Sequence, residues 1–193
     1  MKLIVGIGNP GRRYATSRHN LGWVVVDALA DRYGLGRARR RFEGWLREGR
    51  IDGVAVALLK PTTYVNESGR SVALVANWYH LAMEEVLVCC DDVHLPLGRL
   101  RVRRSGSSGG HGGLASIIER LATDGFARLR VGIGPPGRTP RGDPGPETDQ
   151  VRHVLGRFRR SEWPTVEAAV ERAADAVVTW ARQGIDACMN AFN

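Results

Sequence analysis

The chain has 193 residues, of which 43% are hydrophobic, and this is enough for one domain that buries roughly 70% of its unfolded surface. Its three cysteines show neither disulfide nor zinc-ligand spacing, and no apolar run reaches the roughly 18 residues of a membrane span, so we expect a cytoplasmic protein without membrane contact. The net charge of +8 is concentrated in arginine-rich clusters at 37–41, 99–104 and 157–160, which favour a nucleic-acid partner over a membrane surface.

The apolar patterns predict strands and helices that alternate along the chain. Runs rich in β-branched residues predict strands at 3–8, 45–50, 54–60, 86–90, 99–104 and 128–133. Helical spacing predicts helices at 20–34, 67–80, 112–122 and 163–182. This alternation predicts an α/β fold, in which a single domain over residues 1–193 contains a twisted, mixed (mostly parallel) sheet flanked by helices.

Two segments in the second half of the chain differ in composition from the rest. Residues 135–150 are rich in proline, glycine and charge, and we expect them to form a mobile loop inside the domain. Residues 161–193 are expected to form a helical C-terminal segment.

The first predicted strand ends in GIGNPG at 6–11, which has the G-x-G-x-x-G spacing of dinucleotide-binding folds. That site needs a helix that begins directly after the third glycine and faces the pyrophosphate. Pro10 and the polar stretch at 12–20 prevent such a helix, and no acid ends the strand predicted at 54–60. We therefore favour a plain strand-to-loop turn and expect no nucleotide cofactor.

His19 and Asp91 are the candidates for acid–base chemistry. His19 lies in TSRHN at 16–20, just before the first helix, and Asp91 directly follows the buried run at 86–90. A carboxylate at a strand end accepts the imidazole Nδ1 proton and leaves Nε2 free as a base. The alternative is an ordinary surface histidine beside Asn20, which would cap the helix.

Two further motifs allow more than one interpretation. Asn66, in KPTTYVNESG at 60–69, either caps the next helix or offers its amide to a carbonyl oxygen. GSSGG at 106–110 matches a nucleophile elbow around Ser108, with His153 in the expected order, but the strand before it is too charged. We interpret these glycines as a flexible cover whose N–H groups approach an anion. The histidine and acid spacing predicts no metal site.

Six motifs together, in chain order, resemble bacterial-type peptidyl-tRNA hydrolases over nearly the whole chain: LIVGIGNPG, YATSRHNLG, KPTTYVNESG, DDVHLPLG, GGHGGL and RLRVGIG. The resemblance implies a hydrolase that cleaves the ester between a peptide and the 3′-terminal ribose of tRNA, as a monomer without metal or cofactor. It also implies that His19 activates the attacking water and that Asp91 orients and polarises His19.

The resemblance assigns substrate contacts as well. It implies that Asn9 and Asn66 hold the peptide end and the 3′-terminal nucleotide of the tRNA, and that Arg103 and Arg130 clamp the tRNA 5′-phosphate. Residues Tyr14, Val65 and Gly112 belong to the same tRNA-binding and substrate-binding set.

The chain departs from the family pattern at a few of these positions. Gly112 replaces an asparagine, and we expect weaker substrate binding or a substituted contact from His111 rather than lost chemistry. Val65 replaces a methionine under the nucleotide, and His94 replaces an acid near the catalytic aspartate. The missing amide leaves an alternative open, namely an RNA-binding protein on the same scaffold with weak or no hydrolase activity.

The loop at 135–150 is longer than is usual in the family. Arg138 and Arg141 in this loop are candidates for additional phosphate contacts.

Overall fold

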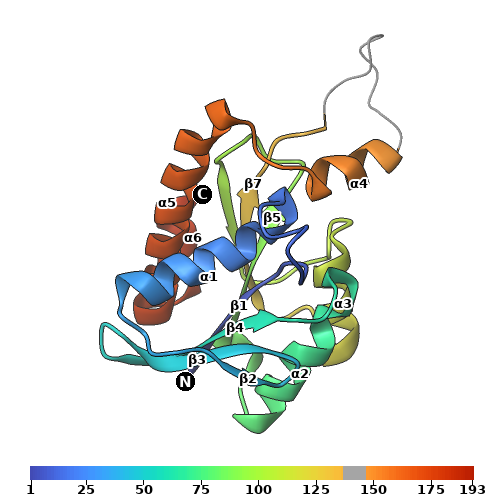
Figure 1. Cartoon of the computed structure of the whole chain (residues 1–193). Helices are drawn as coiled ribbons and strands as arrows, with labels where there is room; N and C mark the ends of the chain where they lie inside the picture. The colour runs from blue at the N-terminus through green and yellow to red at the C-terminus, as the bar shows by residue number, and fades with distance from the viewer. Residues whose placement is uncertain (137–146) are drawn as a thin grey trace.

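A seven-stranded mixed sheet forms the centre of the computed structural model, which describes residues 1–136 and 147–193 (Figure 1). The strand order is β2-β3-β4-β1-β5-β7-β6. The four central strands β4, β1, β5 and β7 are parallel, whereas β2, β3 and β6 pair antiparallel at the two edges. The strands span β1 (Lys2–Gly6), β2 (Arg39–Arg41), β3 (Gly44–Ile51), β4 (Val54–Pro61), β5 (Val86–Asp92), β6 (Leu100–Arg103) and β7 (Ala127–Gly132).

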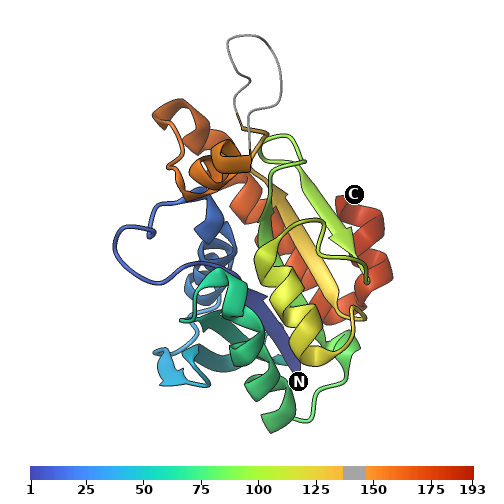
Figure 2. The same ribbon diagram turned by 90° about the vertical axis from the view of Figure 1, so that its right-hand side faces the viewer.

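Helices cover both faces of this sheet, which explains why the central strands β4, β1 and β5 consist mainly of apolar residues. Helices α1, α5 and α6 lie on one face, and α2 and α3 lie on the other (Figures 1 and 2). The helices are α1 (Leu21–Arg32), α2 (Ser68–Trp78), α3 (Gly112–Leu121), α4 (Glu147–Leu155), α5 (Trp163–Gln183) and α6 (Ile185–Phe192). The α/β class predicted from the sequence is confirmed.

The strand register places apolar residues of neighbouring strands on a common face. Ile4 of β1 pairs with Leu58 of β4 and Leu87 of β5, and all three belong to the core beneath α1 and α5. The residues on either side of it, Leu3 and Val5, point the opposite way into the core beneath α2 and α3. Two layers of apolar contacts therefore hold the strand ends in fixed positions.

Three details differ from the sequence-based prediction. Residues 147–150, expected in a loop, already belong to α4, and residues 137–146 of that loop, with Arg138 and Arg141, lie outside the described residues. The short edge strand β2 consists of three arginines and has no apolar alternation that would reveal it. The C-terminal helical segment is interrupted at Gly184, whose φ of 86° separates α5 from α6.

None of the helices in the described residues combines the length and apolarity required to cross a bilayer.

The beginning of α1 packs tightly against the ends of β1 and β5, and Gly22 makes this possible. A Cβ atom on Gly22 would lie 2.3 Å from the carbonyl oxygen of Cys89 and 2.6 Å from the nitrogen of Ile7. His19 lies three residues before this contact on one side, and Asp91 lies two residues after Cys89 on the other. The missing side chain thus allows the two segments to approach closely enough for these residues to meet.

Replacing Gly22 with alanine is expected to lower the free energy of unfolding by about 1–3 kcal/mol, because the new methyl group overlaps rigid backbone atoms. Urea denaturation measures this free energy of unfolding for the variant and the wild type. Gly36→Ala is the matched control, since no atom lies within 4 Å of its added Cβ. Equal stability of the two variants would contradict the prediction.

Candidate active site

Two adjacent acids end β5 and point to opposite faces of the sheet, because successive strand residues alternate. Asp91 faces the side covered by α1 and meets His19, whereas Asp92 meets Arg130 of β7. Both acids are almost fully buried, with exposed fractions of 1% and 6%. The end of one central strand therefore supplies a carboxylate to each side.

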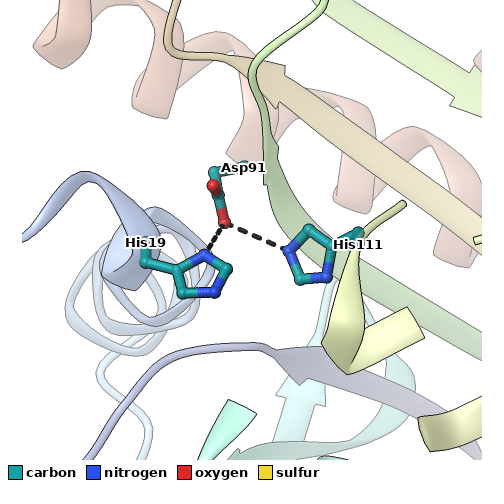
Figure 3. A group of neighbouring side chains, drawn as sticks. All are labelled: His19, Asp91 and His111. Carbon is teal, nitrogen blue, oxygen red and sulfur yellow. Dashed lines mark hydrogen bonds and ion pairs between the residues drawn. The ribbon is translucent and has the colours of Figure 1, made fainter. Parts of the chain in front are cut away.

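His19 and Asp91 form a direct hydrogen bond, as the sequence predicted (Figure 3). Nδ1 of His19 lies 2.7 Å from Oδ1 of Asp91. The short helix that carries His19 is anchored by Arg18, which is buried and pairs with Glu162 at 2.9 Å. With Nδ1 donating to the carboxylate, Nε2 of His19 is left as the basic nitrogen.

A second imidazole reaches the same oxygen. Nε2 of His111 lies 3.2 Å from Oδ1 of Asp91 (Figure 3). Nδ1 of His111 accepts hydrogen bonds from the backbone N–H groups of Gly113 and Leu114, at 3.1 and 3.4 Å, and so caps α3. An accepting Nδ1 carries no proton, so the proton lies on Nε2, which donates to Asp91.

The charges of this group stabilise each other. Burial alone lowers the pKa of His19, but the negative charge of Asp91 and the hydrogen bond to it outweigh burial, so the pKa lies above its ordinary value of 6.5. Burial alone raises the pKa of Asp91, but the His19 charge and the hydrogen bonds from both histidines bring it well below its usual range. Asp91 is therefore a permanent anion that stabilises the protonated form of His19.

Asn9 is held rigidly beside this group. Its backbone N–H donates to Oδ1 of Asn20 at 2.8 Å, and its carbonyl accepts from Nδ2 of Asn20 at 3.0 Å. Its side-chain oxygen accepts from the N–H of Val65 at 3.0 Å, which leaves Nδ2 as the open donor among the described contacts. Asn20 was expected to cap α1 with its side chain; that prediction is wrong, because the side chain bonds to Asn9 instead.

Asn66 contributes a second amide. It lies in a 3-10 turn before α2, is exposed, and has no hydrogen-bond partner within the described residues, so the capping alternative is wrong. Gly112 lies next to it, since a Cβ at Gly112 would be 3.9 Å from Cβ of Asn66. Val65, the residue before Asn66, is buried in the core beneath α2 and α3. Tyr14, in the loop at 11–17, is half-buried, and Cζ of Arg13 lies 4.5 Å from the centre of its ring.

The two arginines expected to bind phosphate differ in environment. Arg103, on the edge strand β6, is exposed. The side chain of Arg130 is only 11% exposed and bonds to Asp92 at 3.1 Å and to the carbonyls of Ser107 and Ser108 at 3.2 and 2.9 Å. Arg103 donates to the carbonyl of Val102 at 3.0 Å but remains exposed to solvent, whereas Arg130 is largely buried and bonded on both sides.

A cleft of about 220 Å³ opens over His19, Asp91 and His111. Helix α4 forms its far wall with Gln150, Val151 and Val154. Sequence reasoning missed this wall, although Val151, Val154 and Leu155 have helical i, i+3, i+4 spacing. The composition of residues 135–150 concealed the helix because the proline-rich and glycine-rich part directly precedes it.

Among the described residues, the cleft lacks a side chain for covalent catalysis by a nucleophile. No serine, threonine or cysteine lines the cleft within the described part of the chain. The ring of His153, the base that a nucleophile elbow around Ser108 would need, bonds to the carbonyl of Gly134 instead, which argues against such an elbow. His94 lies exposed at the cleft, with its N–H bonded to Asp92.

Three side chains with potential metal-ligand atoms meet at the floor of the cleft. His19, Asp91 and His111 offer ligand atoms within 4.8 Å of one another. Metal binding through Nε2 of His111 would move its proton to Nδ1, which faces two backbone N–H groups. The residues present therefore do not fit a metal ion.

The cleft holds a histidine hydrogen-bonded to a buried carboxylate, an arrangement typical of enzymes that use acid–base chemistry. The family described as peptidyl-tRNA hydrolase matches residues 3–193. A peptidyl-tRNA hydrolase of Synechococcus sp. (strain JA-3-3Ab) is 46% identical over 194 residues, covering 100% of this chain and 83% of the relative. One from Caldanaerobacter subterraneus is 44% identical over the full length of both.

A solved structure of the same family has the same fold. The crystal structure of peptidyl-tRNA hydrolase from Acinetobacter baumannii matches with a TM-score of 0.88 at 36% identity, covering 100% of this chain and 94% of that one. This chain belongs to the peptidyl-tRNA hydrolase family, and the resemblance seen in the sequence motifs is confirmed.

Replacing Asp91 with asparagine is expected to shift the pKa of His19 from above 6.5 to below 6.5, because the attracting charge disappears while burial remains. NMR titration of the imidazole measures both values. Asp186→Asn, which removes an exposed surface carboxylate, is the control and should leave the pKa unchanged. A midpoint that stays the same in the Asp91 variant would contradict this account.

Proposed function

We propose that this chain hydrolyses the ester bond between a peptide and the 3′-terminal ribose of tRNA, with His19 as base and Asp91 as its orienting anion. The observation that carries the proposal is the 2.7 Å contact between these two residues at the floor of the cleft. Nε2 of His19 takes a proton from water as the oxygen attacks the ester carbonyl. The same nitrogen then protonates the ribose oxygen that leaves, which gives a free peptide carboxylate and free tRNA.

The amides supply the remaining stabilisation. The free amide of Asn66 is placed to donate to the oxyanion that develops in the transition state, a contact worth roughly 10²-fold or more. The open Nδ2 of Asn9 is suited to a peptide carbonyl. An unblocked aminoacyl-tRNA lacks that group, so the same donor would favour peptidyl-tRNA. Tyr14, Val65 and Gly112 complete the proposed substrate surface.

The positive charge of the chain is suited to binding the phosphates of tRNA. We place the 5′-phosphate of the acceptor end near Arg103 and Arg130, since the net charge of +8 favours a polyanion and exposed Arg103 is open to it. The base and the amides come from one chain, so a monomer suffices. We also propose that the enzyme acts in the cytoplasm, because its three cysteines are free and buried.

The alternative, an RNA-binding protein with little activity, is not favoured. A protein that only binds RNA has no use for a buried carboxylate that raises the pKa of a histidine facing a cleft. The glycine at 112 removes one substrate contact and leaves the pair intact.

Replacing His19 with alanine is expected to lower release of peptide from N-blocked aminoacyl-tRNA by roughly 10²- to 10⁴-fold, because the base is lost. Single-turnover hydrolysis measures the rate, and filter binding should show nearly unchanged tRNA affinity. His80→Asn is the control, as His80 is exposed and asparagine tolerates its φ of 49°. Wild-type rates in His19→Ala would refute the proposal.

Replacing Arg103 with glutamine is expected to weaken tRNA binding and to reduce the slope of log K against log salt by roughly 0.7–0.9, the value for one lost phosphate contact. Binding titrations at several salt concentrations measure the slope. Arg172→Gln, a matched loss of one charge on the exposed face of α5, should leave the salt slope unchanged. If both variants behave alike, Arg103 is not a phosphate contact.

A further inference from the structure

The segment at 104–111 between β6 and α3 carries His111, and its backbone is intrinsically flexible. Gly106, Gly109 and Gly110 adopt φ values of 133°, 57° and 81°, which other residues rarely reach. A chain with several such glycines loses much conformational entropy when it becomes ordered. Contacts from outside the segment must therefore hold His111 in the position that bonds to Asp91.

Two arginines of β7 provide these contacts. Arg130 donates through Nη2 to the carbonyls of Ser108 and Ser107, while its Nη1 bonds to Asp92. Arg128 is fully buried and donates to the carbonyl of Gly106.

The segment also covers the Arg130 side chain. A Cβ at Gly109 would lie 3.1 Å from both terminal nitrogens of Arg130, so the backbone rests directly on the guanidinium. The planar fork of Arg130 thus spans Asp92 at the end of β5 and the carbonyls of the flexible segment.

A continuous line of hydrogen bonds leads from Arg130 to the base. The carbonyl of Ser108 accepts from Arg130 at 2.9 Å and from the N–H of His111 at 3.1 Å. His111 in turn donates to Oδ1 of Asp91, which accepts from His19 (Figure 3). Arg130 therefore fixes the carbonyl that fixes His111, and His111 fixes the orientation of the carboxylate.

We infer that Arg130 is a positioning residue for ester hydrolysis, which holds His111 against Asp91 by binding the carbonyl oxygens of Ser107 and Ser108. This inference rests on the proposed function and goes beyond an electrostatic role of Arg130 toward tRNA. A lysine keeps the charge but has no planar fork that reaches Asp92 and both carbonyls at once. The conservative replacement should therefore damage the chemistry, while a phosphate contact would tolerate it better.

The test compares Arg130→Lys with wild type on two substrates. One is an N-acetylaminoacyl-tRNA; the other is the N-acetylaminoacyl ester of the trinucleotide CCA, which has no tRNA 5′ end. We expect kcat to fall roughly 10- to 100-fold on both esters with little change in KM, the order of loss when catalytic groups move by ~1 Å. Arg172→Lys, on the exposed face of α5 and outside the arginine clusters, is the control and should keep wild-type kcat.

Wild-type turnover of the trinucleotide ester by Arg130→Lys would overturn the inference and leave Arg130 as a phosphate contact only. A wild-type protein that cleaves neither ester would instead overturn the proposed function, and the inference with it.

A second experiment guards against misfolding of the Arg130 variant. His111→Asn retains a side chain that caps α3 but removes the imidazole that reaches Asp91. If Arg130 acts through His111, adding Arg130→Lys to His111→Asn should cost little further activity. Losses that multiply in the double variant would overturn the inference, and thermal unfolding of each variant confirms that the fold is intact.

Discussion

The cleft is organised around one atom, Oδ1 of Asp91. Two imidazoles from opposite sides of the sheet end on this oxygen, one preceding α1 and one preceding α3. The carboxylate is almost completely buried, so its charge is poorly screened by water and acts strongly on both rings. His19 gains basicity from this anion, and His111 prevents the anion from turning away. Loss of the carboxylate would leave His19 without its hydrogen-bond partner, whereas His111 would keep its bonds to the N–H groups of Gly113 and Leu114.

Close packing and buried hydrogen bonds together bring these groups into place. The close approach of Gly22 to the carbonyl of Cys89 fixes α1 on the ends of β1 and β5. Asn20 then fixes Asn9 through two hydrogen bonds, and Asn9 accepts the N–H of Val65. Through these contacts the loops that follow β1 and β4 are fixed relative to the end of β5. A preorganised set of donors requires little reorganisation during the reaction.

The arginines show that charge in a sequence has more than one use. Exposed Arg103 contributes to the field that attracts a polyanion. Arg128 has no carboxylate partner in the described residues and serves the interior, where burial and the nearby charge of Arg130 lower its pKa. Arg130 also bonds within the protein, since it neutralises Asp92 and holds the segment at 104–111. The net charge thus overstates the number of positive groups that a tRNA meets at the surface.

The sequence by itself determined the α/β order of elements and the strand ends that carry Asn9 and Asp91, because apolar periodicity and strand-end position are local properties. It offered the pairing of His19 with Asp91 as one of two interpretations, and the structure decided between them. It did not reveal α4, the contact of Asn20 with Asn9, or the different burial of Arg103 and Arg130. Only the tertiary structure decided these, since each depends on which surfaces meet after the chain has folded. His111 is the clearest case: its position before α3 follows from the sequence, but its bond to Asp91 requires β5 and α3 to lie side by side.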